Sequence, residues 1–278
     1  MLIALMQSDA GLLPCRLRLL EPVFHRPEGA EEPGAVGAGY VSNGHALVQK
    51  GPGSLAEHGA FELLAGVKAP AAIVHLRRAT VGGYREENTH PFRHHNWLFA
   101  HDGTVAGFGD LRPSLVEGLP SFLQRAIAGD TDTEHVFAVF LAELAEADLL
   151  KTHHPAAADV AAALSRTITR VEHLATTVSG DGHSTLDLVA TNGRALVASR
   201  VGARPLWWTE LGAIETCEVC GLDADTPANH PLRLSHDALR TVVVSTLVAD
   251  TTGWNELEHG QILAWDQDLN LVRITTGE

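Results

Sequence analysis

The sequence predicts an α+β domain in which sheets and helices form separate layers. Strand-like segments dominate up to residue 101, two long helical patterns follow, and strand patterns return from residue 184. Strands, then helices, then strands indicate layered sheets rather than a regular βαβ sheet. No internal repeat, low-complexity tract or linker divides the chain, so residues 1–278 are expected to form a single domain.

Strand patterns alternate with shorter helical patterns up to residue 101. The strands are expected at residues 2–8, 36–41, 45–50, 71–78 and 96–101. Helices are expected at 11–24, with a proline in the first turn where its missing N–H does no harm, and at 54–66, capped by Ser54. Asn43-Gly44 is a strong hairpin signal between two of the strands. Residues 26–34 are rich in Pro, Glu and Gly and are expected to form an exposed loop.

The rest of the chain begins with two long helices and ends in strands. Residues 133–148 carry apolar side chains at helical spacing, and residues 154–178 are Ala-rich with Pro155 at their start. Strands are expected at 186–190, 195–200, 206–208, 241–248 and 261–265. The last two are expected to complete the sheets.

Composition and charge exclude several classes of protein. The 278 residues are 45% apolar, which is enough for a large core, and their formal net charge is −14. An acidic chain repels phosphate backbones, so neither nucleic acid nor an anionic membrane is an expected partner. No segment approaches the roughly 20 apolar residues that span a bilayer. No basic residue precedes the apolar start, and the three cysteines suit a reducing compartment, so a cytoplasmic protein is expected.

Three segments carry the residues that point to a function. They are His75-Leu76-Arg77-Arg78-Ala79-Thr80-Val81-Gly82 with the following Asn88-Thr89-His90-Pro91-Phe92, then Phe99-Ala100-His101-Asp102-Gly103, then Gly129-Asp130-Thr131-Asp132-Thr133-Glu134. In this order and spacing they resemble class II glutamine amidotransferases. The small stand-alone group that includes the γ-glutamyl hydrolase of ergothioneine synthesis is especially similar. Val243-Val244-Ser245 and Trp254 also fit, so the resemblance covers nearly the whole chain.

The resemblance implies an N-terminal-nucleophile hydrolase fold. This fold is a four-layer αββα sandwich, with two mostly antiparallel sheets stacked between layers of helices. The resemblance also implies a ligand that is glutamine or a γ-glutamyl small molecule. No cofactor and no metal is expected, and a partner subunit is considered.

Two charged residues are candidates for holding the substrate. An arginine at the end of a buried strand can form a bidentate pair with a carboxylate, and the resemblance assigns Arg77 to the α-carboxylate of glutamine. The resemblance assigns Asp132 to the α-amino group. The alternatives are a structural ion pair for Arg77 and simple helix capping for Asp132.

Other residues are expected to shape the same site. The resemblance places Asp102 and Gly103 at the oxyanion hole, where the family has Asn-Gly. Asn88, His90 and Phe92 are expected in a loop that forms a pocket wall, and their alternative is a plain ordered turn. Thr80 and Gly82 are expected to complete the loop beside the arginine.

The sequence departs from the family pattern at two positions. The family nucleophile is a cysteine directly after the initiator methionine, and its own α-amino group can act as the base. Leu2 occupies that position and has no nucleophilic atom, and its bulk makes removal of Met1 less expected. At Asp102, an ionised carboxylate has no hydrogen to donate to an oxyanion. The chain is therefore expected to lack ordinary glutaminase activity.

The three cysteines raise two further alternatives. Cys15 could act as a displaced nucleophile after removal of fourteen residues, but the cut would delete the first strand, and a lone cysteine in an apolar helix is usually inert core. Cys217-Glu218-Val219-Cys220 with His230 could supply three zinc ligands, although no second CxxC is present to match it.

Three functions remain open at this level. The first is a binding or regulatory pseudoenzyme that holds glutamine or a γ-glutamyl compound. The second is an active hydrolase or transferase that uses an unusual nucleophile, such as processed Cys15. The third is a structural or partner-subunit relative with a closed pocket, in which Arg77 pairs with an acid such as Asp102.

Overall fold

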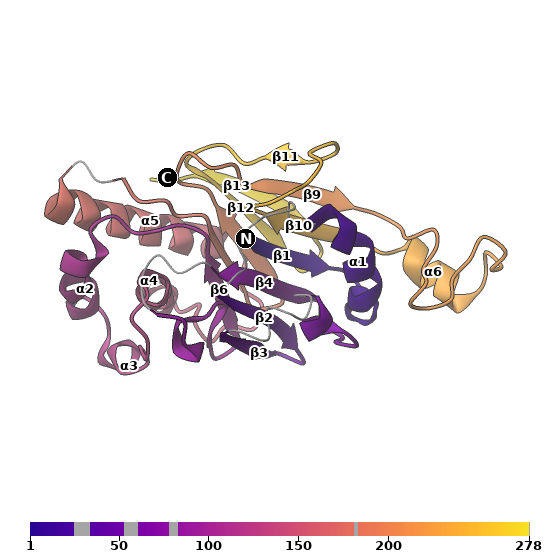
Figure 1. The fold of residues 1–278 in the computed structure, drawn as a ribbon, viewed down its shortest axis with the longest axis horizontal. Helices are drawn as coiled ribbons and strands as arrows, with labels where there is room; N and C mark the ends of the chain where they lie inside the picture. The colour runs from indigo at the N-terminus through magenta and orange to yellow at the C-terminus, as the bar shows by residue number, and fades with distance from the viewer. Residues whose placement is uncertain (25–33, 53–60, 78–82, 181–182, 278) are drawn as a thin grey trace.

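Two antiparallel sheets lie face to face between helices in a computed structural model of the chain (Figure 1). The structure describes residues 1–24, 34–52, 61–77, 83–180 and 183–277. Helices cover the outer face of each sheet, and three separate apolar clusters fill the spaces between the four layers. The expected αββα sandwich is confirmed.

The first sheet has seven strands, in the order β11-β9-β10-β1-β4-β2-β3. Its strands are β1 (Leu2–Gln7), β2 (Ala35–Ser42), β3 (His45–Pro52), β4 (Ala71–Arg77), β9 (Trp207–Leu211), β10 (Thr241–Ser245) and β11 (Asn255–Glu256). β1 is the central strand: Leu2 lies opposite His75 of β4, and Ile3 lies opposite Ser245 of β10.

The second sheet has six strands, in the order β13-β12-β8-β7-β6-β5. Its strands are β5 (Phe92–His94), β6 (Trp97–His101), β7 (Leu188–Thr191), β8 (Ala195–Ser199), β12 (Gln261–Asp266) and β13 (Leu271–Thr275). Both sheets therefore combine strands from distant parts of the chain.

Helices form the two outer layers. The α-helices are α1 (Leu13–Leu20), α2 (Phe108–Glu117), α3 (Ser121–Gln124), α4 (Asp132–Glu146), α5 (Ala157–Ser179) and α6 (Pro231–Asp237). Short 3₁₀ turns occur at Ala10–Leu12, Glu21–Phe24, Glu62–Leu64 and Glu86–Asn88. α1 covers the seven-stranded sheet, and α2, α4 and α5 cover the six-stranded one. α6 belongs to an excursion between β9 and β10 that projects from the body of the protein (Figure 1).

β1 is apolar at almost every position because its side chains alternate between two buried faces. Leu2, Ala4 and Met6 pack between the two sheets, whereas Ile3 and Leu5 pack toward α1. Successive side chains of a strand point to opposite faces, so a strand covered on both sides needs apolar residues at every position.

Several predicted elements differ in their bounds from the structure. The expected helix at 11–24 is a 3₁₀ turn, the short α1 and a second 3₁₀ turn, and Pro22 in that second turn has no N–H to continue the α-helical ladder. Residues 26–33 of the expected loop and residues 54–60 of the expected helix lie outside the described part of the chain. The described end of the latter forms the 3₁₀ turn Glu62–Leu64.

Three short helices and the strands β5, β11 and β13 were not predicted from the sequence. α2 begins after Gly107 at φ 63° and contains Pro113. Glycine and proline both disfavour helices, so the sequence around them does not predict one. Its buried residues Phe108, Leu111 and Leu115 nevertheless follow helical spacing, and this signal could have revealed it.

None of the helices in the described ranges is both long and apolar enough to cross a bilayer.

Candidate functional site

A cavity of about 430 Å³ lies where several strands of both sheets end. The start of β1, the ends of β4, β6 and β10 and the N-terminus of α4 all reach it. Its lining residues are Met1, His75, Leu76, Arg77, His90, His101, Asp102, Gly103, Thr104, Thr131, Asp132, Thr133, Arg204, Thr246 and Leu247. This volume falls within the range of small-molecule sites. The structure therefore gathers Arg77, His90, Asp102, Gly103 and Asp132 at one place.

Arg77 is the last residue of β4, and only 4% of its surface is exposed. Its guanidinium donates to the carbonyl of Gly83 at 3.2 Å and lies 5.7 Å from the ring centre of Tyr84. Burial lowers the pKa of Arg77, and the nearby acidic groups of Tyr84 and Asp132 act in the opposite direction. A buried guanidinium held at a cavity wall can bind a ligand carboxylate.

Asp132 begins α4, but Thr131 caps the helix. The Thr131 hydroxyl accepts the N–H of Glu134 at 3.3 Å. The carboxylate of Asp132 accepts the N–H of Val105 at 2.9 Å and that of Thr133 at 2.8 Å. These bonds fix its orientation at the cavity, where an anionic oxygen can accept from a ligand ammonium group.

Asp102 follows β6 and is held by three neighbours. The Thr246 hydroxyl donates to its Oδ2 at 2.5 Å, the Met1 α-amino nitrogen lies 3.4 Å from the same oxygen, and Arg204 lies 3.6 Å from Oδ1. Burial alone would raise the pKa of Asp102, but these contacts hold it below its ordinary value. Among the described residues, Asp102 forms ion pairs with Met1 and Arg204 and not the pair with Arg77 that the alternative of a closed, structural relative predicts.

Gly103 occupies a position that only glycine can fill. A Cβ there would lie 2.1 Å from the carbonyl oxygen of Thr185 and 2.5 Å from Nε2 of His101. Among the hydrogen bonds of the described residues, none uses the Gly103 N–H. That backbone group can therefore donate into the cavity.

Leu2 does not line the cavity. Its side chain is fully buried between the sheets. Its N–H donates to the Thr246 hydroxyl at 2.9 Å, and its carbonyl accepts the Thr246 N–H at 3.0 Å. The lining residue at this end of β1 is Met1, whose α-amino group donates to the Leu76 carbonyl at 2.9 Å. Neither Met1 nor Leu2 has a nucleophilic side chain.

The loop between β4 and β5 contributes in two ways. Asn88 is fully buried and is not part of the cavity lining: its Nδ2 donates to the carbonyl of Gly83 at 3.1 Å, and its Oδ1 accepts the N–H of Asp130 at 2.9 Å. His90 lines the cavity directly. Phe92 begins β5 and packs in the core beside α4. The expected roles of Thr80 and Gly82 fall on residues outside the described part of the chain.

Sequence reasoning placed His90 at the site but gave no role to His75 and His101, which also line the cavity. The rings of His75 and His90 are tilted relative to each other with their centres 4.3 Å apart, and burial lowers the pKa of each well below its ordinary value, so both are neutral. His101 donates from Nε2 to the Thr185 carbonyl at 2.7 Å, and its Nδ1 lies 3.2 Å from the Thr133 hydroxyl. The position of His75 two residues before Arg77, on the same face of β4, could have indicated its place.

Cys15 does not lie at the cavity, where a displaced nucleophile would have to act. It is buried in α1, is absent from the cavity lining, and its Sγ is 3.2 Å from Sγ of Cys220. Cleavage before Cys15 would remove β1, which lies between β4 and β10 at the centre of the sheet.

Comparisons with known proteins agree on one family. The sequence profile described as "Glutamine amidotransferases class-II" matches residues 35–276. DUG3 of Saccharomyces cerevisiae, described as a probable glutamine amidotransferase, is 34% identical over 74 residues, which is 27% of this chain and 21% of the relative. Four curated relatives are matched over between 21% and 39% of their own lengths, so the chain spans well under half of each.

Solved structures share the fold at low identity. A glutamine aminotransferase class-II domain protein from Silicibacter pomeroyi superposes with a TM-score of 0.62 at 16% identity, over 100% of this chain and 99% of that one. Glutamine phosphoribosylpyrophosphate amidotransferase from B. subtilis superposes with a TM-score of 0.56 at 16% identity, over 99% of this chain and 49% of that one.

Proposed function

The chain belongs to the class II glutamine amidotransferases, and we propose that it binds glutamine or a γ-glutamyl compound without ordinary glutaminase activity. The observation that carries the proposal is the placement of Arg77 and Asp132 in the lining of one cavity. A cation and an anion in the lining of one cavity complement the α-carboxylate and α-ammonium groups of an amino acid.

The chemistry around Leu2 and Asp102 supports the loss of hydrolysis. Leu2 offers no nucleophile, and the ionised Asp102 offers no donor for an oxyanion. Loss of a single oxyanion-hole donor typically costs about 10²–10³ in rate. Gly103 retains one backbone donor, which could still orient a ligand carbonyl.

The surroundings of Asp102 also favour a binding site over a closed, purely structural relative. A closed site was expected to pair Arg77 with Asp102. The Asp102 charge is instead compensated by Met1, Arg204 and Thr246. Arg77 lines the same cavity, which is large enough for a small molecule.

Isothermal titration calorimetry of the full chain with glutamine, glutamate and a γ-glutamyl amide tests the proposal. We expect saturable binding that Arg77→Met weakens by about tenfold or more, since charge-assisted pairs are worth roughly 1.5–3 kcal/mol. Arg125→Met, at an exposed arginine outside the cavity, is the matched control and should bind as wild type does. The absence of binding by any of the three compounds, or rapid ammonia release by the wild type, would refute the proposal.

A further inference from the structure

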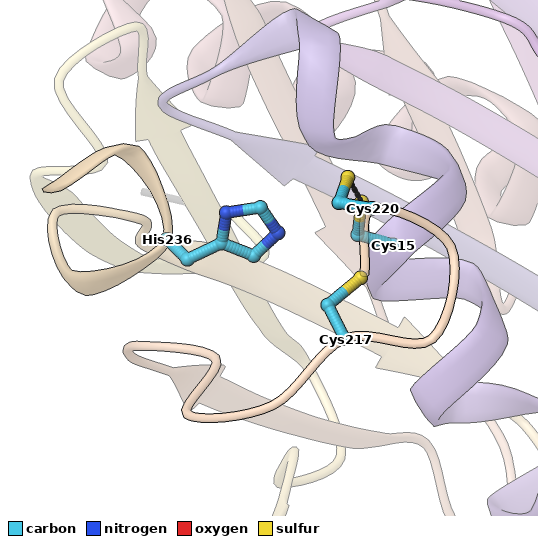
Figure 2. Close-up of side chains that lie close together, drawn as sticks. All are labelled: Cys15, Cys217, Cys220 and His236. Atoms are coloured by element: carbon cyan, nitrogen blue, oxygen red, sulfur yellow. Dashed lines mark hydrogen bonds between the residues drawn. The ribbon is translucent and has the colours of Figure 1, made fainter. Parts of the chain in front are cut away.

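Three cysteines and a histidine from distant parts of the chain converge beside α1 (Figure 2). One ligand atom from each of Cys15, Cys217, Cys220 and His236 lies within 4.8 Å of all the others. We propose that these four side chains bind a structural Zn²⁺ ion. The sequence pattern paired the CxxC with His230, whereas the structure brings Cys15 and His236 to it.

The separations suit a tetrahedral site. Zn–S bonds of about 2.3 Å at tetrahedral angles place two sulfurs about 3.8 Å apart. The observed separations reach at most 4.8 Å, and Sγ of Cys15 lies 3.2 Å from Sγ of Cys220. Metal binding would therefore require only small side-chain rotations to reach the distances of a tetrahedral site. A separation of 3.2 Å is far longer than a disulfide bond, and all three cysteines are free thiols.

His236 is oriented as a metal ligand. It is fully buried, and its Nδ1–H donates to the carbonyl of Leu232 at 2.7 Å. This bond leaves the lone pair on Nε2, and Nε2 is buried without a hydrogen-bond partner among the described residues. Metal-binding histidines usually donate their other N–H to a carbonyl or a carboxylate in this manner. The ring points toward the sulfurs (Figure 2).

The CxxC segment has the backbone to present two sulfurs together. Cys217 and Leu222 exchange N–H···O=C hydrogen bonds of 2.8 and 3.0 Å, which close a tight turn around Cys220. Gly221 follows at φ 70°, a conformation that favours glycine. The turn therefore holds Cys217 and Cys220 at one end, facing Cys15 on α1.

A metal here would stabilise a part of the fold that has little core of its own. The excursion between β9 and β10 shares only a small apolar cluster with α1. Its buried members are Leu12, Cys15, Ile214, Cys217, Leu222 and Leu239. Small cores usually need a disulfide or a metal for stability. Four protein ligands leave no open coordination position, so the ion would be structural rather than catalytic.

Metal analysis of the full chain tests the proposal. The protein is purified under reducing conditions with zinc supplied during expression, and its metal content is measured by mass spectrometry after gel filtration. We expect stoichiometric zinc in the wild type and a loss of about tenfold or more in Cys217→Ser and His236→Gln. The control is His230→Gln, whose exposed imidazole accepts the N–H of Leu232 and caps α6, and it should retain the metal.

Cobalt substitution keeps the test decisive if the ligand variants fail to fold. Wild-type protein loaded with Co²⁺ should show thiolate-to-cobalt charge transfer and the intense visible bands of a tetrahedral ion. Wild type without stoichiometric zinc after supplementation, octahedral cobalt spectra, or a Cys15–Cys220 disulfide in place of metal would each overturn the proposal. Unchanged zinc content in both folded variants would overturn it as well.

Discussion

The Thr246 hydroxyl donates a 2.5 Å hydrogen bond to Oδ2 of Asp102. The Thr246 hydroxyl oxygen in turn accepts the N–H of Leu2 at 2.9 Å. One threonine at the end of β10 therefore joins the two positions at which this chain departs from the family pattern. The contact suggests that Leu2 and Asp102 have to be changed together to restore catalysis.

Leu2→Cys with Asp102→Asn is expected to gain the glutaminase activity that we propose the wild type to lack. Removal of Met1, which lines the cavity, would open the cavity to position 2, where the cysteine supplies a nucleophile, and the asparagine supplies an N–H donor. Leu2→Cys alone should be about 10²–10³-fold less active than the double variant, because it lacks the donor. Glutamate release from glutamine is the measurement.

Leu2→Ala with Asp102→Asn is the matched control for that experiment. It opens similar space at Leu2 and provides the same amide, but it has no nucleophile and should stay inactive. Equal activity in the alanine and cysteine double variants would contradict the predicted role of position 2.

Gly103→Ala should destabilise the fold by about 2–4 kcal/mol, because its Cβ would meet the backbone carbonyl of Thr185. Gly109→Ala is the control. Gly109 lies in α2 with no atom within 4 Å of an added Cβ, so alanine there should leave stability unchanged or raise it by about 0.5 kcal/mol. Urea unfolding measures both variants, and similar midpoints would contradict the prediction.

Asn88→Ala should lower stability by about 2–3 kcal/mol and also weaken ligand binding. The change leaves the Gly83 carbonyl and the Asp130 N–H without their Asn88 partner, and these two groups belong to the loops that precede and support the cavity wall. Asn270→Ala removes an exposed amide bonded to Asp266 and should change stability by less than about 1 kcal/mol. Thermal unfolding and calorimetry test the pair, and a variant that is destabilised yet binds with wild-type affinity would limit Asn88 to a structural role.

Asp187→Asn should change how stability depends on pH. Burial, followed by the charge of Asp102, raises the pKa of Asp187 from 3.8 to about 7. The folded protein binds the proton of the Asp187 carboxyl group more tightly than the unfolded chain does, so protonation of Asp187 stabilises the fold. This stabilisation is fully present below about pH 4 and is lost as the pH rises to about 7. Between about pH 4 and 7 this group lowers the free energy of unfolding by up to about 1.4 kcal/mol per pH unit.

The asparagine variant removes that dependence, so its stability relative to wild type should increase from about pH 4 to pH 7 and change little above pH 7. Asp148→Asn, at an exposed carboxylate in a left-handed conformation that asparagine tolerates, should run parallel to wild type. Urea unfolding at several pH values makes the comparison. A constant difference between Asp187→Asn and wild type across this range would show that Asp187 does not titrate as described.

Elements with strong local patterns could be predicted from the sequence, and contacts between distant segments could not. β1 and α4 follow apolar patterns that require no tertiary information. The motif strings predicted that Arg77 and Asp132 belong to one site, and both line the same cavity, but nothing local shows that Thr246 would bridge Leu2 and Asp102. The fold, by contrast, followed from the resemblance of several motifs in order.

The cysteines illustrate the same limit. His230 is nearer to the CxxC in sequence, but it caps α6 from an exposed position, whereas one and a half turns further along the helix His236 points inward. The face of α6 on which a histidine lies decides whether it reaches the sulfurs. Because the short α6 was not predicted, the sequence could not show that His236 is the one that does. Cys15 lies on α1, and only the packing of α1 against the excursion brings it to the other two.

The central place of β1 has a consequence for how the molecule is assembled. Ile3 pairs with Ser245, and Leu5 with Val243, so the middle of the seven-stranded sheet joins residues separated by almost the entire chain. Loop closure over such separations makes folding slow, because the entropy is lost before the contacts form. Until β10 arrives, one edge of β1 has unpaired backbone groups that could bind another strand. Partly folded chains should therefore be most prone to aggregation through this edge.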